Sequence, residues 1–126
     1  MKLSYIIPFY NGQDTIHHCL DSILAIGLDL NELEIIIVDD CSPISAESVL
    51  GEYIAKHPNI RIVRHKVNKR QDGAKNTGIT LAKGKYIAFA DQDDTIPSNN
   101  GVIKALEFAI RNPKRLLRNM RDTFIK

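Results

Sequence analysis

Apolar residues in this chain occur in two patterns, short continuous runs and stripes at helical spacing. The short runs are rich in β-branched residues and end at turn residues, so they predict strands at 3–9, 33–38, 60–64 and 86–90. The run from Leu33 to Val38 is almost entirely apolar, which is typical of a strand that is covered on both faces in a parallel sheet. The elements between the strands are therefore expected to cover both faces of one sheet.

The stripes at helical spacing lie between and after these runs. They predict helices at 15–26, 42–57, 73–83 and 101–112, with a polar loop at 68–72. Asp14 is the predicted N-cap of the first helix, and Gly27 is its predicted stop. Ser42 is the predicted N-cap of the second helix, because Pro43 then occupies the first helical position. A further amphipathic segment, 114–124, is predicted after the fourth helix.

The regular alternation of strand and helix predicts an α/β fold with three layers, a mostly parallel sheet and right-handed crossovers. Such sheets bind ligands, commonly nucleotides, outside the carboxyl ends of the strands, where the strand order reverses. Aromatic and acidic side chains follow three of the predicted strands directly: Tyr10, then Asp39 and Asp40, then Asp91, Asp93 and Asp94. The topology predicts that these groups meet at one edge of the sheet.

Length and composition agree with one globular domain, because the chain has 126 residues, of which 44% are hydrophobic and 25% are charged. The apolar runs, such as Ile35–Val38, are far shorter than the roughly 20 residues of a membrane-spanning helix. Pro8 interrupts the first apolar stretch and no cleavage site follows it, so we expect a cytoplasmic protein without a secretory signal. Cys19 and Cys41 are interpreted as reduced thiols. The histidines show no metal-ligand spacing with them and are predicted to be surface or cap residues: His17, His18, His57 and His65.

Charge divides the chain into two parts. Residues 1–100 carry 10 basic and 13 acidic side chains, whereas residues 101–126 carry 7 basic and 2 acidic ones. A compact acidic body is not typical of nucleic-acid-binding domains, so we expect no nucleic-acid partner. We expect a nucleotide-binding domain at 1–98 and a basic helical segment at 99–126. That segment either contacts an anionic membrane surface, at the inner face of the membrane, or packs on the domain or on a partner such as a second copy.

The acidic clusters have a structural interpretation and a functional one. Aspartates are common in turns and helix caps, where they accept backbone hydrogen bonds. However, three carboxylates within four residues, as at Asp91, Asp93 and Asp94, repel one another unless a cation compensates them. Carboxylate oxygens suit Mg²⁺ or Mn²⁺, which bind one or two carboxylates together with waters and substrate phosphates. The sequence therefore favours a metal site that binds a diphosphate.

Four segments of the chain resemble, in order and spacing, successive motifs of the family 2 glycosyltransferases of the GT-A class: 4–11, 34–42, 68–78 and 84–94. The resemblance covers about residues 2–98. It implies a Rossmann-like GT-A domain that binds a UDP-sugar or similar nucleotide-sugar, in an inverting, metal-dependent glycosyltransferase. It also implies a carbohydrate or lipid-linked acceptor and a role in polysaccharide or glycoconjugate biosynthesis.

The resemblance implies roles for individual residues on the donor side. Tyr10 would stack beside the base, Asp40 would accept a hydrogen bond from the base, and Asp39 would support its loop. Lys75 and Asn76 would lie near the diphosphate and the sugar. The nucleotide-sugar-binding set implied in this way is Pro8, Tyr10, Asp39, Asp40, Lys75, Asn76, Asp91 and Gln92. The usual glycines of two family loops are replaced here by Cys41 and Arg70, so we expect the nucleotide loop to differ in shape.

The implied metal ligands are Asp91, Asp93 and Asp94, and the implied cofactor is Mn²⁺ or Mg²⁺. Asp93 would bind the metal, Asp91 would reach the ribose or a metal-bound water, and Asp94 would orient that shell or the sugar. The metal would neutralise the charge on the departing nucleoside diphosphate. In the family the catalytic base lies well downstream, in an acceptor half that the 32 residues after Asp94 do not resemble. No residue is therefore assigned as the base.

Two alternatives stay open. The first is a truncated, non-catalytic domain that binds a nucleotide-sugar without transferring the sugar. The second is a phosphatase, because 91–95 also fits the DxDxT pattern of haloacid-dehalogenase-like enzymes, although that motif usually follows the first strand. A dinucleotide oxidoreductase is excluded, because the segment after the first predicted strand lacks the G-x-G-x-x-G pattern.

Overall fold

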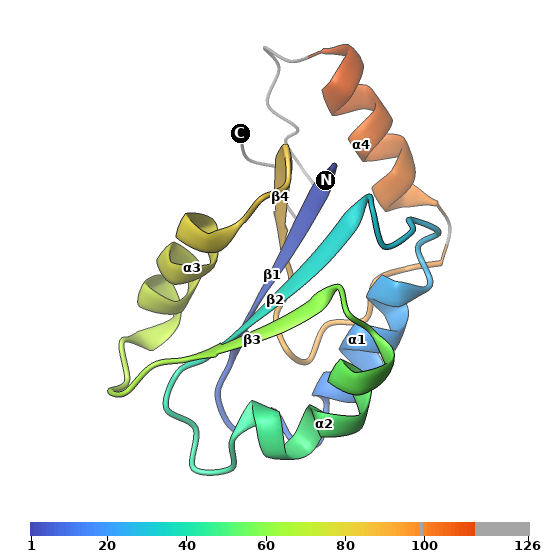
Figure 1. Cartoon of the computed structure of the whole chain (residues 1–126). Helices are drawn as coiled ribbons and strands as arrows, with labels where there is room; N and C mark the ends of the chain where they lie inside the picture. Colours follow the sequence, from blue (N-terminus) through green and yellow to red (C-terminus); the bar gives the residue numbers. More distant parts are fainter. Residues whose placement is uncertain (99, 113–126) are drawn as a thin grey trace.

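A computed structural model describes residues 1–98 and 100–112 of the chain (Figure 1). Four strands form one sheet in the order β3-β2-β1-β4, and each neighbouring pair is parallel. The strands are β1 (Leu3–Phe9), β2 (Leu33–Asp39), β3 (Ile60–Arg64) and β4 (Tyr86–Phe89). The helices are α1 (Ile16–Leu24), α2 (Ala46–Lys56), α3 (Arg70–Leu81) and α4 (Gly101–Arg111). The predicted alternation of strand and helix is confirmed.

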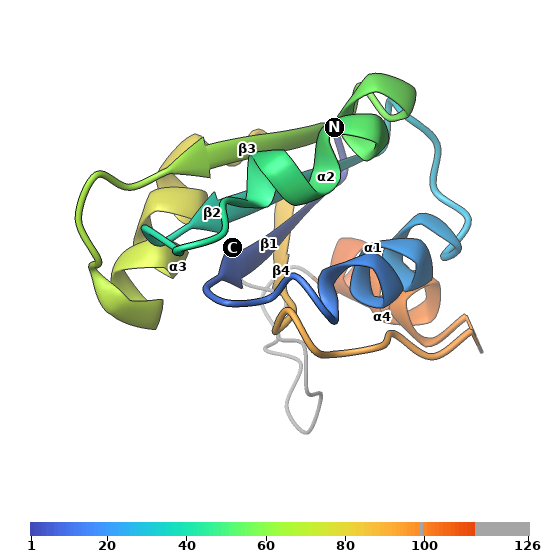
Figure 2. The same ribbon diagram turned by 90° about the horizontal axis from the view of Figure 1, so that it is seen from below.

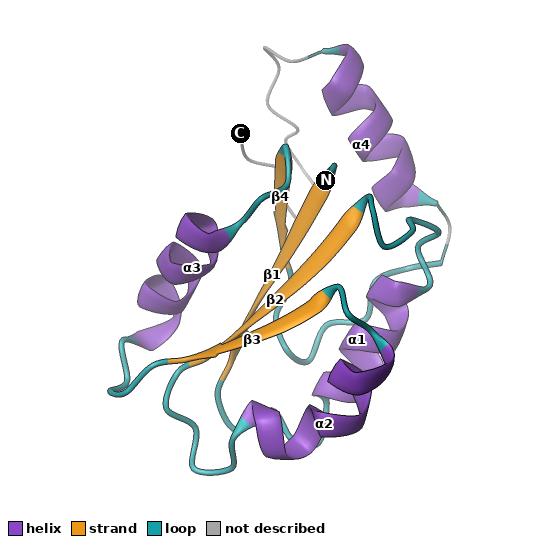
Figure 3. Cartoon of the chain, in the orientation of Figure 1, coloured by secondary structure: helices purple, strands orange, loops and turns teal. Residues whose placement is uncertain are grey.

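Helices cover both faces of the sheet. Helices α1, α2 and α4 lie on one face and α3 lies on the other (Figures 1 and 3). The chain adds β2 and β3 on one side of β1 and then returns to the other side of β1 for β4. Because parallel crossovers are right-handed, this reversal of direction places α3 on the face opposite α1 and α2. The predicted three-layer α/β architecture is confirmed.

The two central strands supply most of the core. Leu3, Tyr5 and Ile7 of β1 are fully buried against α1, α2 and α4, and burying each such side chain stabilises the fold by about 1.5–3 kcal/mol. On the opposite face, Ile36 packs with Ala74 of α3. Helix α3 approaches β1 so closely at Gly78 that a Cβ atom there would clash with Ile6. Small residues on α3 therefore fix its distance from the sheet.

The predicted starts of the first three helices are wrong in detail, whereas α4 begins at Gly101 as predicted. The N-cap of α1 is Thr15 rather than Asp14, and its side chain makes no capping hydrogen bond. Helix α2 begins after Ser45, whose hydroxyl accepts a hydrogen bond from the Ser48 N–H at 3.1 Å. The prediction of Ser42 as this cap fails because its hydroxyl is buried and accepts a hydrogen bond from the Asn11 N–H at 2.9 Å. Helix starts thus depend on contacts between loops that lie far apart in sequence.

Two further boundaries bear on the site. Helix α3 begins at Arg70, so the segment 70–72, predicted as loop, forms the first turn of that helix. Helix α4 packs on the domain, because Val102, Ala105 and Leu106 belong to the same core as α1 (Figure 2). The predicted amphipathic segment 114–124 lies outside the described residues. In the part of the chain that the structure describes, no helix is both long and apolar enough to span a membrane.

Candidate functional site

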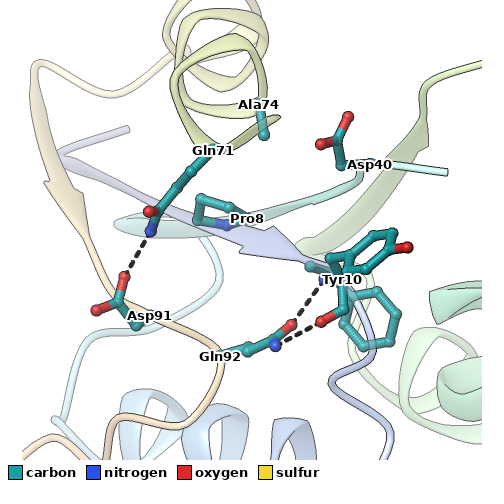
Figure 4. Close-up of a pocket in the computed structure, with 8 residues that line it drawn as sticks. Pro8, Tyr10, Asp40, Gln71, Ala74, Asp91 and Gln92 are labelled. Atoms are coloured by element: carbon teal, nitrogen blue, oxygen red, sulfur yellow. Dashed lines mark hydrogen bonds between the residues drawn. The ribbon is translucent and has the colours of Figure 1, made fainter. Parts of the chain in front are cut away.

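A pocket of about 240 Å³ opens at the carboxyl ends of the strands (Figure 4). It lies where the strand order reverses between β1 and β4, which is where parallel α/β sheets bind ligands. The lining residues come from β1 and the loop after it, the loops after β2 and β4, and α3: Pro8, Phe9, Tyr10, Asp40, Gln71, Ala74, Asp91 and Gln92. The structure thus brings five of the eight implied donor-binding residues to one pocket.

The loop after β1 and the loop after β4 are joined by one side chain. Gln92 Nε2 donates a hydrogen bond to the Tyr10 carbonyl at 2.7 Å, and the Tyr10 N–H donates to Gln92 Oε1 at 2.8 Å (Figure 4). The backbone pairing of β1 with β4 ends at Ile6 and Phe89. Beyond that point, the side-chain amide of Gln92 links the two segments that follow these strands. A Cβ atom on Gly12 would clash with the Gln92 amide, so a larger residue at this position would have to displace that amide. The polar groups of Gln92 therefore hold Tyr10, whose ring is 44% exposed at the pocket.

The loop after β4 gathers three carboxylates. Asp91, Asp93 and Asp94 each offer one oxygen, and the three oxygens lie within 4.8 Å of one another. The loop is a tight turn, because the Asp94 N–H donates to the Asp91 carbonyl at 2.9 Å and the Asp91 N–H donates to Asp94 Oδ2 at 3.0 Å. Gln71 Nε2 of α3 donates to Asp91 Oδ1 at 3.0 Å (Figure 4). This set of oxygen donors fits a hard divalent cation such as Mg²⁺ or Mn²⁺.

Asp39, at the end of β2, is fully buried and does not line the pocket. Its Oδ1 accepts from the Ser42 N–H at 2.9 Å, and its Oδ2 accepts from the Ala46 N–H at 2.8 Å. Arg64 Nη1 at the end of β3 also donates to Oδ2, at 2.8 Å. Asp39 thereby connects β2, β3 and the first turn of α2, whose backbone N–H groups have no partner within the helix.

Asp40 has a different set of partners. Its Oδ1 accepts hydrogen bonds from the Lys69 N–H at 2.7 Å and from His65 Nδ1 at 2.8 Å. Burial raises the pKa of Asp40, but the hydrogen bonds from Lys69 and His65 outweigh burial and hold that pKa below its ordinary value. Asp40 is therefore a carboxylate at neutral pH, and it lines the pocket.

The prediction that His65 is a surface or cap residue is wrong. Its side chain is only 6% exposed, and its Nε2 lies 2.8 Å from Thr77 Oγ1 of α3. Apolar periodicity cannot identify a buried histidine, because the residue is polar. The available signal was its position, since His65 directly follows a strand at the same edge of the sheet as Asp40.

Lys75 and Asn76 lie on α3 but do not line the pocket. The Lys75 ammonium lies 5.4 Å from the centre of the Phe89 ring, and Asn76 is exposed. The residues of α3 that do line the pocket, Gln71 and Ala74, were not identified from the sequence. Gln71 fell in a predicted loop, and only the earlier start of α3 puts these two residues three positions apart on one side of the helix.

The two residues that replace family glycines keep a backbone conformation that glycine favours. Cys41 has a φ of 62° and Arg70 has a φ of 63°. Each carries a side chain in the left-handed region, at a cost of roughly 1–2 kcal/mol. The loops around Asp40 and the start of α3 are therefore held in these conformations by their surroundings.

The model of the family described as "Glycosyl transferase family 2" matches residues 4–117 of the chain. The poly(ribitol-phosphate) beta-glucosyltransferase of Bacillus spizizenii is 42% identical over 99 residues, which make up 78% of this chain and 16% of that protein. S. aureus TarS 1–349 in complex with UDP is 28% identical with a TM-score of 0.78, and the match covers 88% of this chain and 32% of the TarS 1–349 chain.

A third similar protein supports the fold alone. The mannosyltransferase PcManGT from Pyrobaculum calidifontis, in complex with GDP-Man and Mn²⁺, is 24% identical with a TM-score of 0.79. That match covers 86% of this chain and 32% of PcManGT. The chain thus spans about a third of these two solved structures and about a sixth of the Bacillus relative.

Proposed function

This chain belongs to glycosyl transferase family 2, and from that membership we propose that it is the donor-binding part of an inverting, metal-dependent glycosyltransferase. The observation that carries the proposal is the convergence of Tyr10, Asp40 and Asp91 on one pocket, from three loops far apart in sequence. The position of the pocket at the switch point of the sheet agrees with a nucleotide ligand. The names of the relatives support a role in polysaccharide or teichoic acid biosynthesis.

The proposed donor is a UDP-sugar. TarS with UDP supports this choice, because it has the same fold and 28% sequence identity. The exposed ring of Tyr10 offers a face on which a base can stack, and the Asp40 carboxylate can accept a hydrogen bond from a base N–H. The pocket is smaller than the roughly 300–1,000 Å³ typical of whole-ligand sites. We assign it to the base and ribose, with the diphosphate over the loop after β4.

Asp91 and Asp93 would hold a divalent cation at that loop, with Asp94 completing the set of carboxylates. A bound Mn²⁺ or Mg²⁺ would neutralise the negative charge on the leaving diphosphate. The contribution of the chain itself is orientation. Gln71 fixes the Asp91 carboxylate from α3, and Gln92 fixes the loop relative to Tyr10. These contacts would hold the base-stacking ring of Tyr10 and the carboxylates for the cation in fixed positions relative to each other.

The proposed acceptor of the transferred sugar is a carbohydrate or a lipid-linked saccharide. The lining side chains all fit donor functions in this account, so we assign no catalytic base among residues 1–98 and 100–112. Since the chain spans only about a tenth to a third of these relatives, a domain that binds the donor without transferring sugar is the second candidate. Family membership leaves the phosphatase alternative without support.

Calorimetric titration of UDP into the 126-residue chain, with and without Mn²⁺, tests the proposal. We expect Mn²⁺ to tighten UDP binding by at least tenfold, and Asp93→Ala to abolish this enhancement. Glu107→Ala, which removes an exposed carboxylate on α4, is the matched control and should bind UDP as the wild type does. UDP binding that responds neither to Mn²⁺ nor to Asp93→Ala contradicts the metal assignment. Transfer or hydrolysis of a UDP-sugar by the same sample separates an enzyme from a binding domain.

A further inference from the structure

A chain of buried polar side chains runs beneath the pocket and joins three elements. Asp40 follows β2, His65 follows β3, and Thr77 lies on α3. His65 Nδ1 lies 2.8 Å from Asp40 Oδ1, and His65 Nε2 lies 2.8 Å from Thr77 Oγ1. The Asp40 and His65 side chains are each 6% exposed. Of the three residues, only Asp40 lines the pocket, so the other two act on a ligand only through it.

The hydrogen-bond partners fix which ring nitrogen carries a proton. Because the pKa of Asp40 lies below its ordinary value, its carboxylate only accepts, and His65 Nδ1 must donate. The Thr77 hydroxyl lies 2.8 Å from His65 Nε2 and 3.1 Å from the Gly73 carbonyl. It donates to Nε2 when the ring is neutral, and to Gly73 when Nε2 itself carries a proton. The bond from Nδ1 to Asp40 is therefore kept in both protonation states of the ring.

The same bond sets the orientation of the Asp40 carboxylate. Both His65 Nδ1 and the Lys69 N–H bond to Oδ1, and neither uses Oδ2. Two donors that converge on one oxygen restrict rotation of the carboxylate. The Arg70 backbone N–H also donates to this carboxylate. Because His65 and Lys69 both bond to Oδ1 and Asp40 lines the pocket, we take Oδ2 as the oxygen that is presented to a ligand. Charge-assisted bonds of this kind are short and geometrically specific.

We infer that His65 is a positioning residue for the donor base: it holds Oδ1 of Asp40, so that Oδ2 accepts the hydrogen bond from the ring N–H of the base. This inference rests on the proposed function, in which Asp40 contacts the base. It assigns to Thr77 the secondary task of fixing the His65 ring against α3. A purely structural histidine would instead stabilise the fold without affecting which groups of a ligand are recognised.

Two substitutions of His65 separate a positioning role from a structural one, because each keeps only one of the two hydrogen bonds of the ring, to Asp40 or to Thr77. In His65→Asn the side-chain amide occupies the position of Nδ1 and can still donate to Asp40. In His65→Gln the amide reaches the position of Nε2, so the contact with Thr77 is kept and the bond to Asp40 is lost. Thr77→Val serves as the matched control for the Thr77 contact, and thermal unfolding of each variant reports its stability.

The measurement is the Kd of UDP for each variant, with N3-methyl-UDP as a second ligand that lacks the ring N–H. We expect His65→Gln to weaken UDP binding about tenfold, consistent with losing the orientation of a charged hydrogen bond. We expect His65→Asn and Thr77→Val to stay within about threefold of the wild type. N3-methyl-UDP should bind the wild type weakly and should be insensitive to His65→Gln.

Each other outcome has a definite meaning. If His65→Gln binds UDP as the wild type does, the inference is wrong while the proposed function stands. If His65→Gln weakens UDP and N3-methyl-UDP equally, His65 acts through the fold and not through the Asp40 bond, which also overturns the inference. If the wild type binds no UDP, the proposed function itself is wrong, and the inference falls with it.

Discussion

Aspartates stand at the end of β2 and in the loop after β4, at the same edge of the sheet, yet they use their carboxylates in opposite ways. Asp39 is fully buried, and three donors occupy its two oxygens. Asp91 and Asp93 are exposed, and within residues 1–98 and 100–112 the side-chain donor to Asp91 is Gln71. Buried carboxylates with many donors hold loops in place, whereas exposed ones that crowd together are suited to a cation. Residue type and position after a strand are therefore not enough to assign a role.

Asp40 lies between these two cases. It is as buried as a structural residue, but one of its oxygens is left out of the hydrogen bonds from His65 and Lys69. It also lines the pocket, which Asp39 does not. The difference between adjacent aspartates follows from strand geometry, because successive side chains along an extended segment point in opposite directions.

The largest expected effect is on stability at the buried loop. Asp39→Asn replaces one acceptor oxygen with a donor that faces the N–H groups of Ser42 or Ala46, so we expect a loss of about 2–4 kcal/mol in the free energy of unfolding. Asp93→Asn, the matched substitution in the exposed loop, should change stability by less than about 0.5 kcal/mol without metal. Urea denaturation of both variants measures the contrast. Equal losses of unfolding free energy in the two variants would show that Asp39 does not stabilise the fold more than Asp93 does.

The next largest effect is expected on UDP affinity, when the Gln92 amide that joins the loops after β1 and β4 is removed. Gln92→Ala removes two hydrogen bonds to the Tyr10 backbone, each of which contributes about 0.5–1.5 kcal/mol. We expect Tyr10 to become mobile and the affinity for UDP to fall about fivefold, because binding must then order that loop. Gly12→Ala, whose added methyl group would displace the Gln92 amide, should have a similar effect on Kd. An unchanged Kd in both variants would mean that the connection does not support binding.

A smaller gain in stability is expected in the loop after β2. Cys41 has a φ of 62°, so Cys41→Gly should relieve backbone strain and stabilise the chain by about 1 kcal/mol. Cys41→Ser keeps the strain and is the matched control. Thermal unfolding of the two variants measures the difference. A destabilised glycine variant would show that the Cys41 side chain contributes more through its contacts than its conformation costs.

The smallest expected effect is the pH dependence contributed by Asp40. Because its pKa in the folded chain lies below 3.8, this group stabilises the fold at higher pH and loses that contribution as the pH falls below 3.8. The difference in unfolding free energy between the wild type and Asp40→Asn should therefore shrink as the pH is lowered from 6 to 3. Urea denaturation across this range measures it. A constant difference would mean that the carboxylate is not favoured by its partners in the folded state.

Much of the fold could be predicted from the sequence, because apolar periodicity reports which face of an element is buried. The four strands and the alternation with helices follow from that pattern, and so does the meeting of Tyr10, Asp40 and Asp91 at one edge. The start of α2 could not be predicted, since the Ser42 hydroxyl is used by the loop after β1 instead of by α2.

The site shows the same limit. The resemblance put Asp39 in the donor-binding set as a support for its loop, and the Asp39 side chain hydrogen-bonds to the start of α2 and to the end of β3. Periodicity could not identify Gln71 or His65, because their importance comes from a partner in another element, Asp91 and Asp40 respectively; for His65 the only signal was its position directly after a strand. Periodicity describes one element at a time, whereas such hydrogen bonds depend on how elements meet.

The most direct test of the central claim is to map where Mn²⁺ binds in the presence of UDP. Paramagnetic broadening of backbone amide NMR signals reports residues close to Mn²⁺, whatever their separation in sequence. We predict broadening at the loop after β4 together with Tyr10, Asp40 and Gln71, which line the same pocket. Broadening centred instead on the exposed acids and histidine around α2, at Asp21, Glu52 and His57, or no broadening at all, would contradict the account.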